Sequence, residues 1–387
     1  MIMTVFMNTE GGDSMIIIRM SGGLERQMFQ YALYMKLTAM GREVKFDDIN
    51  EYRDDRAKPI MLSVFGLSYP RATWKEINVF TDGSTQLLDR LRRMLGRRRT
   101  NIYREKGYYD PQILTMESAY LDGSFQSEKY FEDIKKEVHE AFCFPDLSTM
   151  HLPQPIYDST LELLTRIRNT NAVGIHIRRS DSRPNEELYE NICTPEYYRA
   201  AVNYIQERCP DATYYIFSNE PKWIKGWMKD LIKSQITEEM TREEVQVIRR
   251  RFVMVQTNTE YTSYLDLLLL ESCKHNIISN SSFSWWGAWL NENPDKIVIA
   301  PIPWMNNSQG EEIYTEGMIL INGKGKVEQG KINGYYSYGR RIGKSAFSVC
   351  VILPAAVNGK NCENGCDNRI WAGTRQKAYA LGIECSI

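Results

Sequence analysis

The strongest constraint on the fold is an alternation of strand-like and helical segments between residues 173 and 300. Apolar runs typical of strands occur at 173–177, 214–217, 252–255, 276–278 and 296–300. Helical patterns separate them at 195–208, 221–232, 262–273 and 284–292. Strands that alternate with helices favour right-handed crossovers and a parallel sheet covered on both faces. Ligands of such sheets bind beyond the carboxyl ends of the strands.

The amino-terminal part repeats this pattern in a shorter form. Residues 16–18 predict a buried strand, which a glycine turn at 21–23 follows. Residues 28–39 then predict a helix, and a second strand is expected at 44–46. The polar, proline-bearing stretch 146–155 is typical of a linker. The sequence therefore predicts two α/β domains, over 15–150 and 155–322. An extension at 1–14 and an irregular tail at 323–387 flank them.

The bulk composition excludes some partners. Lys and Arg together number 48 against 49 Asp and Glu, so no global field draws the chain to nucleic acid or to anionic lipid. The start lacks a basic, apolar leader, and the apolar cluster at 265–270 is far too short for a membrane span, so a cytoplasmic location is expected. Residues 90–99 hold six arginines, which are most often a solvated face. A second reading is peripheral contact with an anionic inner membrane.

The segment VGIHIRRSD, 173–181, predicts an anion site at the end of a strand. Period-two alternation puts His176 and Arg178 on one strand face, opposite the apolar residues. Arg178 and Arg179 then follow the strand end, where two permanently charged guanidinium forks suit a diphosphate. Solvated arginines at an exposed strand end are the competing interpretation.

A second candidate anion site is SNSSFSWWGAWL, 279–290. Ser281 and Ser282 stand where a strand gives way to a helix, and the free N–H groups of a helix start attract anions. Simple serine capping above a tryptophan core would explain the same residues. The turn with Gly22 and Gly23 lacks the spacing of a dinucleotide fingerprint and is a weak signal by itself. No metal-ligand set is visible, so neither a metal nor another cofactor is expected.

Five segments in this order resemble the bacterial α-1,2-fucosyltransferases of glycosyltransferase family 11. They are GGLERQMFQYA, YLDGSFQSEKYF, VGIHIRRSD, YIFSNE and NSSFSWWGAWL, between about residues 16 and 322. The resemblance implies a GT-B-like α/β fold, with two Rossmann-like domains facing across a cleft. It also implies a galactoside 2-alpha-L-fucosyltransferase, which moves L-fucose from GDP-fucose to the 2-hydroxyl of a galactose-terminated glycan with inversion and without an obligatory metal.

The resemblance also implies roles for individual residues. The amino-terminal domain would take the acceptor and the second domain GDP-fucose. Arg178 would neutralise the departing diphosphate, and Asp181, or less favourably Glu25, would deprotonate or orient the acceptor hydroxyl. The expected donor-binding residues are His176, Arg179, Ser218, Glu220, Ser281, Ser282, Phe283, Gly22 and Gly23.

Several positions depart from the family pattern. Glu25 and Arg26 replace the Gly and Asn of the usual G-G-L-G-N-Q, Ser180 replaces a Gly, and Asn219 replaces an acidic residue. The tail segment 347–354 resembles the first strand of another glycosyltransferase family, which suggests a truncated fusion or a shifted reading frame. A nucleotide-sugar-binding protein that lacks turnover is therefore the alternative function.

Overall fold

The structure is a computed structural model. It describes residues 14–49, 59–97, 100–178, 186–218, 220–256, 260–307 and 310–328, and the backbone of 331–332 and 335–336. The chain divides into two compact units, 1–340 and 341–387, and every described residue lies in the first. The predicted extension at 1–14, except Ser14, and most of the predicted tail at 323–387 lie outside the described residues.

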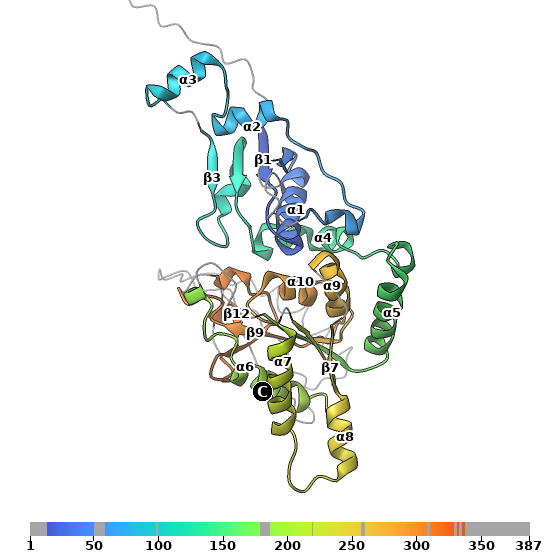
Figure 1. Cartoon of the computed structure of the whole chain (residues 1–387). Helices are drawn as coiled ribbons and strands as arrows, with labels where there is room; N and C mark the ends of the chain where they lie inside the picture. Colours follow the sequence, from blue (N-terminus) through green and yellow to red (C-terminus); the bar gives the residue numbers. More distant parts are fainter. Residues whose placement is uncertain are drawn as a thin grey trace, which may run out of the picture. The chain divides into compact units, whose positions relative to one another are not determined.

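The first sheet has four parallel strands in the order β2-β1-β4-β3. Their bounds are β1 Met15–Arg19, β2 Glu43–Asp47, β3 Ile102–Arg104 and β4 Ala119–Asp122. The central β1 is apolar and its isoleucines are wholly buried, as the sequence predicts. The helices of this part are α1 Leu24–Ala39, α2 Trp74–Thr81, α3 Leu87–Met94 and α4 Lys135–Ala141 (Figure 1).

The second sheet has six parallel strands in the order β10-β9-β8-β5-β6-β7. Their bounds are β5 Ala172–Ile177, β6 Thr213–Ser218, β7 Phe252–Met254, β8 His275–Ile277, β9 Val298–Ile302 and β10 Ile319–Asn322. The helices are α5 Gln154–Arg168, α6 Pro195–Gln206, α7 Pro221–Ser234, α8 Arg242–Arg250, α9 Ser263–Glu271 and α10 Ser282–Leu290. A short antiparallel pair, β11 Lys331–Ile332 and β12 Tyr335–Tyr336, follows.

The order of the second sheet is that of a dinucleotide-binding Rossmann sheet. The chain builds outward from β5 to β6 and β7, then returns to add β8, β9 and β10 on the other side. The direction of winding therefore reverses between β5 and β8, and this is where such sheets open a crevice for ligands. The predicted GT-B-like α/β fold with two Rossmann-like sheets is confirmed. Both sheets lie within the first compact unit, so the domain boundary at residue 150 stays a prediction.

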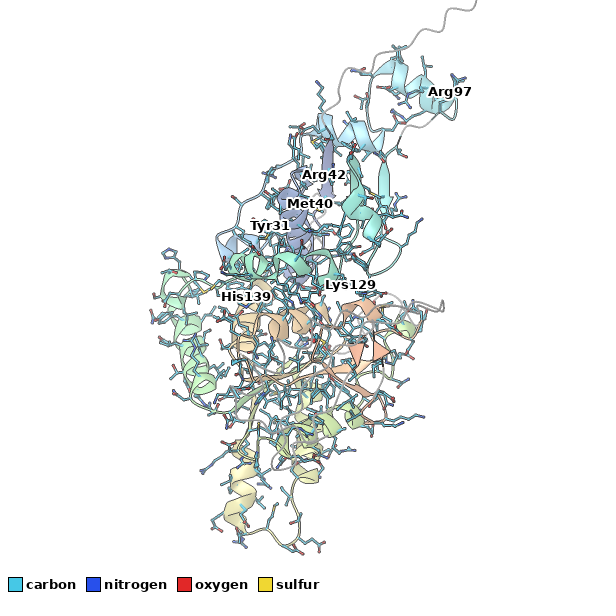
Figure 2. The ribbon with its side chains drawn as sticks, turned by 180° about the vertical axis from the view of Figure 1, so that it is seen from behind. Tyr31, Met40, Arg42, Arg97, Lys129 and His139 are labelled. Atoms are coloured by element: carbon cyan, nitrogen blue, oxygen red, sulfur yellow. The ribbon has the colours of Figure 1, made fainter. Side chains whose placement is uncertain are left out.

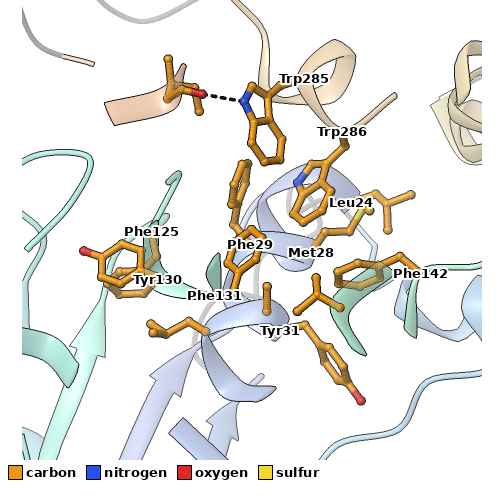
Figure 3. Close-up of a cluster of buried hydrophobic side chains, with 14 of the residues drawn as sticks. Leu24, Met28, Phe29, Tyr31, Phe125, Tyr130, Phe131, Phe142, Trp285 and Trp286 are labelled. Carbon is orange, nitrogen blue, oxygen red and sulfur yellow. Dashed lines mark hydrogen bonds between the residues drawn. The ribbon is translucent and has the colours of Figure 1, made fainter. Parts of the chain in front are cut away.

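Aromatic side chains join the helices that follow β1 and β8. The ring of Phe29 in α1 lies 4.8 Å from Trp285 and 4.7 Å from Trp286 of α10, between ring centroids. All three side chains are wholly buried in one cluster that draws residues from both sheets (Figure 3). The capping interpretation of 279–290 correctly placed these tryptophans in the core.

His275 and the arginine run have side-chain contacts that the sequence pattern did not indicate. His275 opens β8, and its Nδ1 accepts the N–H of Ile297 at 3.0 Å. The solvated face expected for the arginine run holds for Arg90 and Arg97, which are exposed. In α3, however, Arg92 and Arg93 pack against the turn that contains Asp82, because their guanidinium groups find acceptors there.

Candidate functional site

A pocket of about 580 Å³ lies at the carboxyl ends of strands from both sheets. Its walls come from the segments that follow β1, β3, β4, β5, β8 and β9. The lining residues are Gly22, Gly23, Glu25, Arg26, Glu105, Lys106, Gly107, Tyr108, Ser124, Gln126, Arg178, Tyr189, Asn280, Ser281, Ser282, Trp304 and Met305. Six predicted site residues therefore meet in it: Gly22, Gly23, Glu25, Arg178, Ser281 and Ser282.

Arg178 enters this pocket from the point where the winding of the second sheet reverses. Every residue of β5 is buried, and Arg178 is the first residue beyond that strand. Its Nε is buried and has no hydrogen-bond partner among the described residues. A buried cationic donor without a partner is costly unless an anion satisfies it. Arg179 and Asp181, the next two predicted residues, lie outside the described residues.

The start of α10 forms the neighbouring wall. Ser281 is the N-cap residue, yet its side chain makes no capping hydrogen bond. The Ser284 hydroxyl instead donates back to the main-chain oxygen of Ser281 at 3.1 Å. Because the N–H groups of the first turn lack a side-chain cap, they and the positive end of the helix dipole remain available to an anion. Ser281 and Ser282 line the pocket at this point.

His176 is placed behind the pocket wall. It is buried, and its Nδ1 lies 3.0 Å from the hydroxyl of Ser279. The ring of Phe283 lies 5.4 Å from the imidazole between centroids. Neither His176 nor Phe283 is among the residues that line the pocket. The two side chains therefore connect the end of β5 to the turn after β8, and they hold Arg178 and Ser281 in register.

Ser218 and Glu220 do not line the pocket either. Ser218 closes β6 and pairs in register with Ile177, the residue before Arg178. Its hydroxyl accepts the main-chain N–H of Glu220 at 3.0 Å, and the Glu220 side chain is exposed. These two residues therefore lie one strand away from Arg178, at the same sheet edge.

The glycine turn after β1 is held by two buried glutamines. Gln30 accepts the N–H of Ser21 at 3.1 Å and donates to the main-chain oxygen of Gly123 at 2.8 Å. Gln27 donates to the main-chain oxygen of Gly22 at 2.9 Å. Gly22 has a φ of 77°, a conformation that favours glycine. This turn directs Glu25 and Arg26 into the pocket.

Glu105 is the most notable lining residue that the sequence did not reveal. It follows β3, and its two carboxylate oxygens accept the main-chain N–H groups of Ser124 at 2.6 Å and Phe125 at 2.8 Å. Burial raises the pKa of Glu105 to about 7, although these two N–H groups and the Arg26 cation act to lower it. A carboxyl group that titrates near neutrality in a pocket is suited to general acid or base work.

The charges around the pocket are mixed. Arg26, Lys106 and Arg178 contribute cations, and Glu25 and Glu105 contribute carboxyl groups. The Nε of Arg26 donates to the Ser124 hydroxyl at 2.6 Å, so this guanidinium is anchored to the segment that follows β4. Among the described residues, no group of three or more His, Cys, Asp or Glu side chains is placed to hold a metal ion.

Comparisons with known proteins address the identity of the chain. A model of glycosyl transferase family 11 matches residues 105–322. The chain is 28% identical over 309 residues to the alpha-1,2-colitosyltransferase of Escherichia coli, covering 76% of this chain and 94% of that protein. It is 25% identical over 336 residues to the O-antigen biosynthesis glycosyltransferase WbnK of Escherichia coli, covering 78% and 99%.

A solved structure of a mutant Arabidopsis thaliana FUT1 in complex with GDP is also similar. The identity is 13% and the TM-score 0.40, over 78% of this chain and 74% of that chain. The family model, in contrast, spans more than half of this chain and includes Glu105, Arg178 and the start of α10. The chain therefore belongs to glycosyl transferase family 11.

Proposed function

We propose that this glycosyltransferase moves L-fucose from GDP-fucose to the 2-hydroxyl of a terminal galactose, as a galactoside 2-alpha-L-fucosyltransferase. One observation carries the proposal: the unpartnered Nε of Arg178 and the uncapped start of α10 line one pocket at the reversal point of a Rossmann sheet. That arrangement suits the diphosphate of a nucleotide sugar. Membership of glycosyl transferase family 11 supports the reaction class.

The diphosphate would lie between Arg178 and the first turn of α10. Ser281 and Ser282 would donate to its oxygens, and Arg179 would add a second cation. His176 and Phe283 would act from behind by fixing the turn after β8. Ser218 and Glu220 would contact the nucleoside one strand away, where the register of β5 and β6 puts them beside the end of β5.

The reaction would be a direct displacement with inversion. The oxygen of the acceptor 2-hydroxyl forms a bond to the anomeric carbon of fucose, on the face opposite the phosphate. The bond from that carbon to the diphosphate oxygen breaks, and GDP leaves with the electron pair. The hydroxyl proton passes to a carboxylate. Fixed cations aimed at the leaving group stabilise the charge that develops, and no metal is needed for this step in the proposal.

Three carboxyl groups are candidates for the proton acceptor. Asp181 follows the arginines but lies outside the described residues, and Glu25 lines the pocket from the first turn of α1. Glu105 lines the pocket as well, and it combines fixed geometry with a pKa of about 7. We favour Glu105, because a base works best when its pKa lies near the working pH. Asp181 is the alternative, on the ground of its position after the arginines.

The transferred sugar has one specific rival. The colitosyltransferase of Escherichia coli is 28% identical to this chain, so activated colitose is a second candidate donor. A matched assay separates the two sugars: purified protein receives either GDP-fucose or activated colitose, with lactose as the acceptor. If GDP and product are released faster with the colitose donor, colitose and not fucose is the transferred sugar.

The second candidate function is binding without turnover. It is motivated by Glu25 and Arg26, two charged side chains that line the pocket. Arg26 also donates a hydrogen bond to the Ser124 hydroxyl. Labelled GDP-fucose and lactose decide between the two functions. A labelled trisaccharide with an α-1,2 linkage supports the transferase, whereas tight GDP binding with neither transfer nor hydrolysis supports the binder. Unchanged activity after chelation would support the metal-free mechanism.

We place the activity in the bacterial cytoplasm, on galactose-bearing precursors of surface glycans. The name of one relative, an O-antigen biosynthesis glycosyltransferase, motivates that acceptor class. Fractionation of cells that produce the protein would test the compartment. An acceptor screen with linkage analysis would identify the galactoside, and exclusive transfer to non-galactosidic acceptors would refute the acceptor assignment.

A further inference from the structure

The helix α3 presents its apolar side chains to solvent. Five of them are exposed: Leu87 by 71%, Leu88 by 79%, Leu91 by 47%, Met94 by 82% and Leu95 by 76%. At 100° per residue these positions share one arc of the helix, and the charged residues occupy the rest. A surface helix ordinarily buries its apolar stripe, so the orientation of α3 is inverted.

The cause of this orientation is the turn between α2 and α3. Asp82 ends α2 in a left-handed conformation with a φ of 56° and is buried. Arg92 forms an ion pair with its carboxylate. Arg93 donates to the main-chain oxygens of Asp82 at 2.8 Å and Ser84 at 2.6 Å. These bonds turn the basic side of α3 toward the protein and leave the leucines outside.

Two further arginines border the apolar arc. Arg90 lies next to Met94 around the helix, and Arg97, which Figure 2 labels, follows the helix end. Both side chains are exposed. This combination is typical of a helix that lies in a membrane interface, where apolar side chains enter the acyl region and cations remain at the phosphates.

We propose that the apolar face of α3 docks into the surface of an anionic lipid bilayer.

A second copy of the chain is a less suitable partner for this face than the bilayer. A helix of eight residues is about 12 Å long, too short to bury the roughly 800 Å² per partner of a stable interface. Two copies would also bring Arg90 and Arg97 near their equivalents, whereas anionic lipids complement them.

Chain topology places this face away from the pocket. The segment with α3 connects the end of α2 to the start of β3, at the amino-terminal edge of the first sheet (Figure 1). The pocket lies at the carboxyl edge. Docking through α3 would therefore leave the pocket open to a glycan. None of the helices in the described ranges is both long and apolar enough to cross a bilayer.

The test is co-flotation of the full chain with vesicles of phosphatidylcholine alone or mixed with phosphatidylglycerol. The wild type should float with the anionic vesicles, and added salt should weaken this binding. The double variant Leu88→Glu, Met94→Glu should bind those vesicles at least about tenfold more weakly. A control variant, Leu161→Glu with Val247→Glu, adds the same charge at exposed positions of α5 and α8 and should bind like the wild type.

Each other outcome overturns the proposal. Wild type that stays unbound to anionic vesicles, or an α3 variant that binds as the wild type does, excludes α3 as the docking element. Light scattering without lipid measures the oligomeric state of the three proteins. If the wild type and the control variant are dimers and the α3 variant is a monomer, the apolar face of α3 is an interface between two copies of the chain. Transfer to soluble lactose should be equal in all three proteins, so failure of the proposed activity would be recognised separately.

Discussion

The indole N–H of Trp286 donates to the main-chain oxygen of Glu25 at 3.0 Å. The bond joins α10, which carries the candidate diphosphate site, to the first turn of α1, which carries Glu25 and Arg26 into the same pocket. Phe29 packs against the same indole. The positions of the pocket residues that follow β8 and of those that follow β1 are therefore coupled through one buried side chain.

Replacement of Trp286 by Phe should lower the free energy of unfolding by about 1 to 3 kcal/mol, because the bond to the main-chain oxygen of Glu25 is lost and the smaller ring leaves a gap in a wholly buried site. Chemical denaturation would measure this. Trp289→Phe is the control, since its indole donates to the carboxylate of Glu128 from a partly exposed position. Equal losses in the two variants would contradict a special role for Trp286.

Replacement of Arg178 by Ala should slow turnover by about 10²- to 10³-fold, because one preorganised charge at the leaving group is lost. It should also weaken GDP binding, measured by calorimetry. Arg199→Ala, on α6 and outside the pocket, should leave both quantities unchanged. A normal turnover number for Arg178→Ala would reject its role at the diphosphate.

The pH dependence of kcat/KM tests Glu105. A base must be deprotonated, so the rate should rise with pH and level off above about 7, the raised pKa of this group. Glu105→Gln should lose this rise, and Asp181→Asn should keep it. The reverse result would assign the base to Asp181. Because Gln cannot accept both N–H groups of the 124–125 turn, circular dichroism must show that the variant is folded.

The raised pKa of Glu105 should also make the stability of the fold depend on pH. The pKa of Glu105 lies above its usual value of 4.5 in the folded protein, so the fold favours the protonated form. The stabilisation is fully present below pH 4.5 and is lost as the pH rises through about 7. Denaturation at several pH values should show this decline in the wild type and a flatter profile in Glu105→Gln. Parallel profiles would argue against the raised pKa.

Two glycines with the same backbone conformation provide a matched test of the turn after β1. Gly22 has a φ of 77° and Gly41 a φ of 78°. Alanine at either position should cost about 1 to 2 kcal/mol of stability because of the left-handed backbone. At Gly22 the added Cβ would also lie 2.5 Å from the Cδ of Arg26, whereas nothing lies within 4 Å at Gly41. Only Gly22→Ala should therefore reduce activity beyond its effect on stability.

Five of the six strands of the second sheet could be predicted, because an apolar run marks each of them and helical patterns separate most of these runs. The strands β5 and β6 and the helix α6 between them lie within a few residues of their expected bounds. The strand β3 ends in Arg104 and lies between polar and charged residues, so no apolar run marks it. The orientation of α3 could not be predicted for another reason. The sequence shows that the helix has an apolar and a basic face, but not which face packs against the turn that contains Asp82.

The pocket wall from the second sheet was easier to predict than the wall from the first sheet. Arg178 and Ser281 follow recognisable strands, so the rule about carboxyl ends brings them together. Glu105 follows the unrecognised β3, and nothing in its local sequence separates it from a surface carboxylate. A prediction of β3 would have placed Glu105 at the same sheet edge as Gly22 and Ser124. Lys106, Tyr108, Tyr189 and Trp304 lacked any signal of their own.

The cluster around Phe29, Trp285 and Trp286 also limits how this enzyme can be rebuilt. If the amino-terminal half were exchanged between relatives at residue 150, α1 would be separated from the α10 that covers it, and wholly buried rings from both sides would meet water or a mismatched surface. A working chimera would have to include the aromatic face of α10 together with the amino-terminal half. Any property carried by the amino-terminal half is thus tied to a helix whose first turn lines the same pocket.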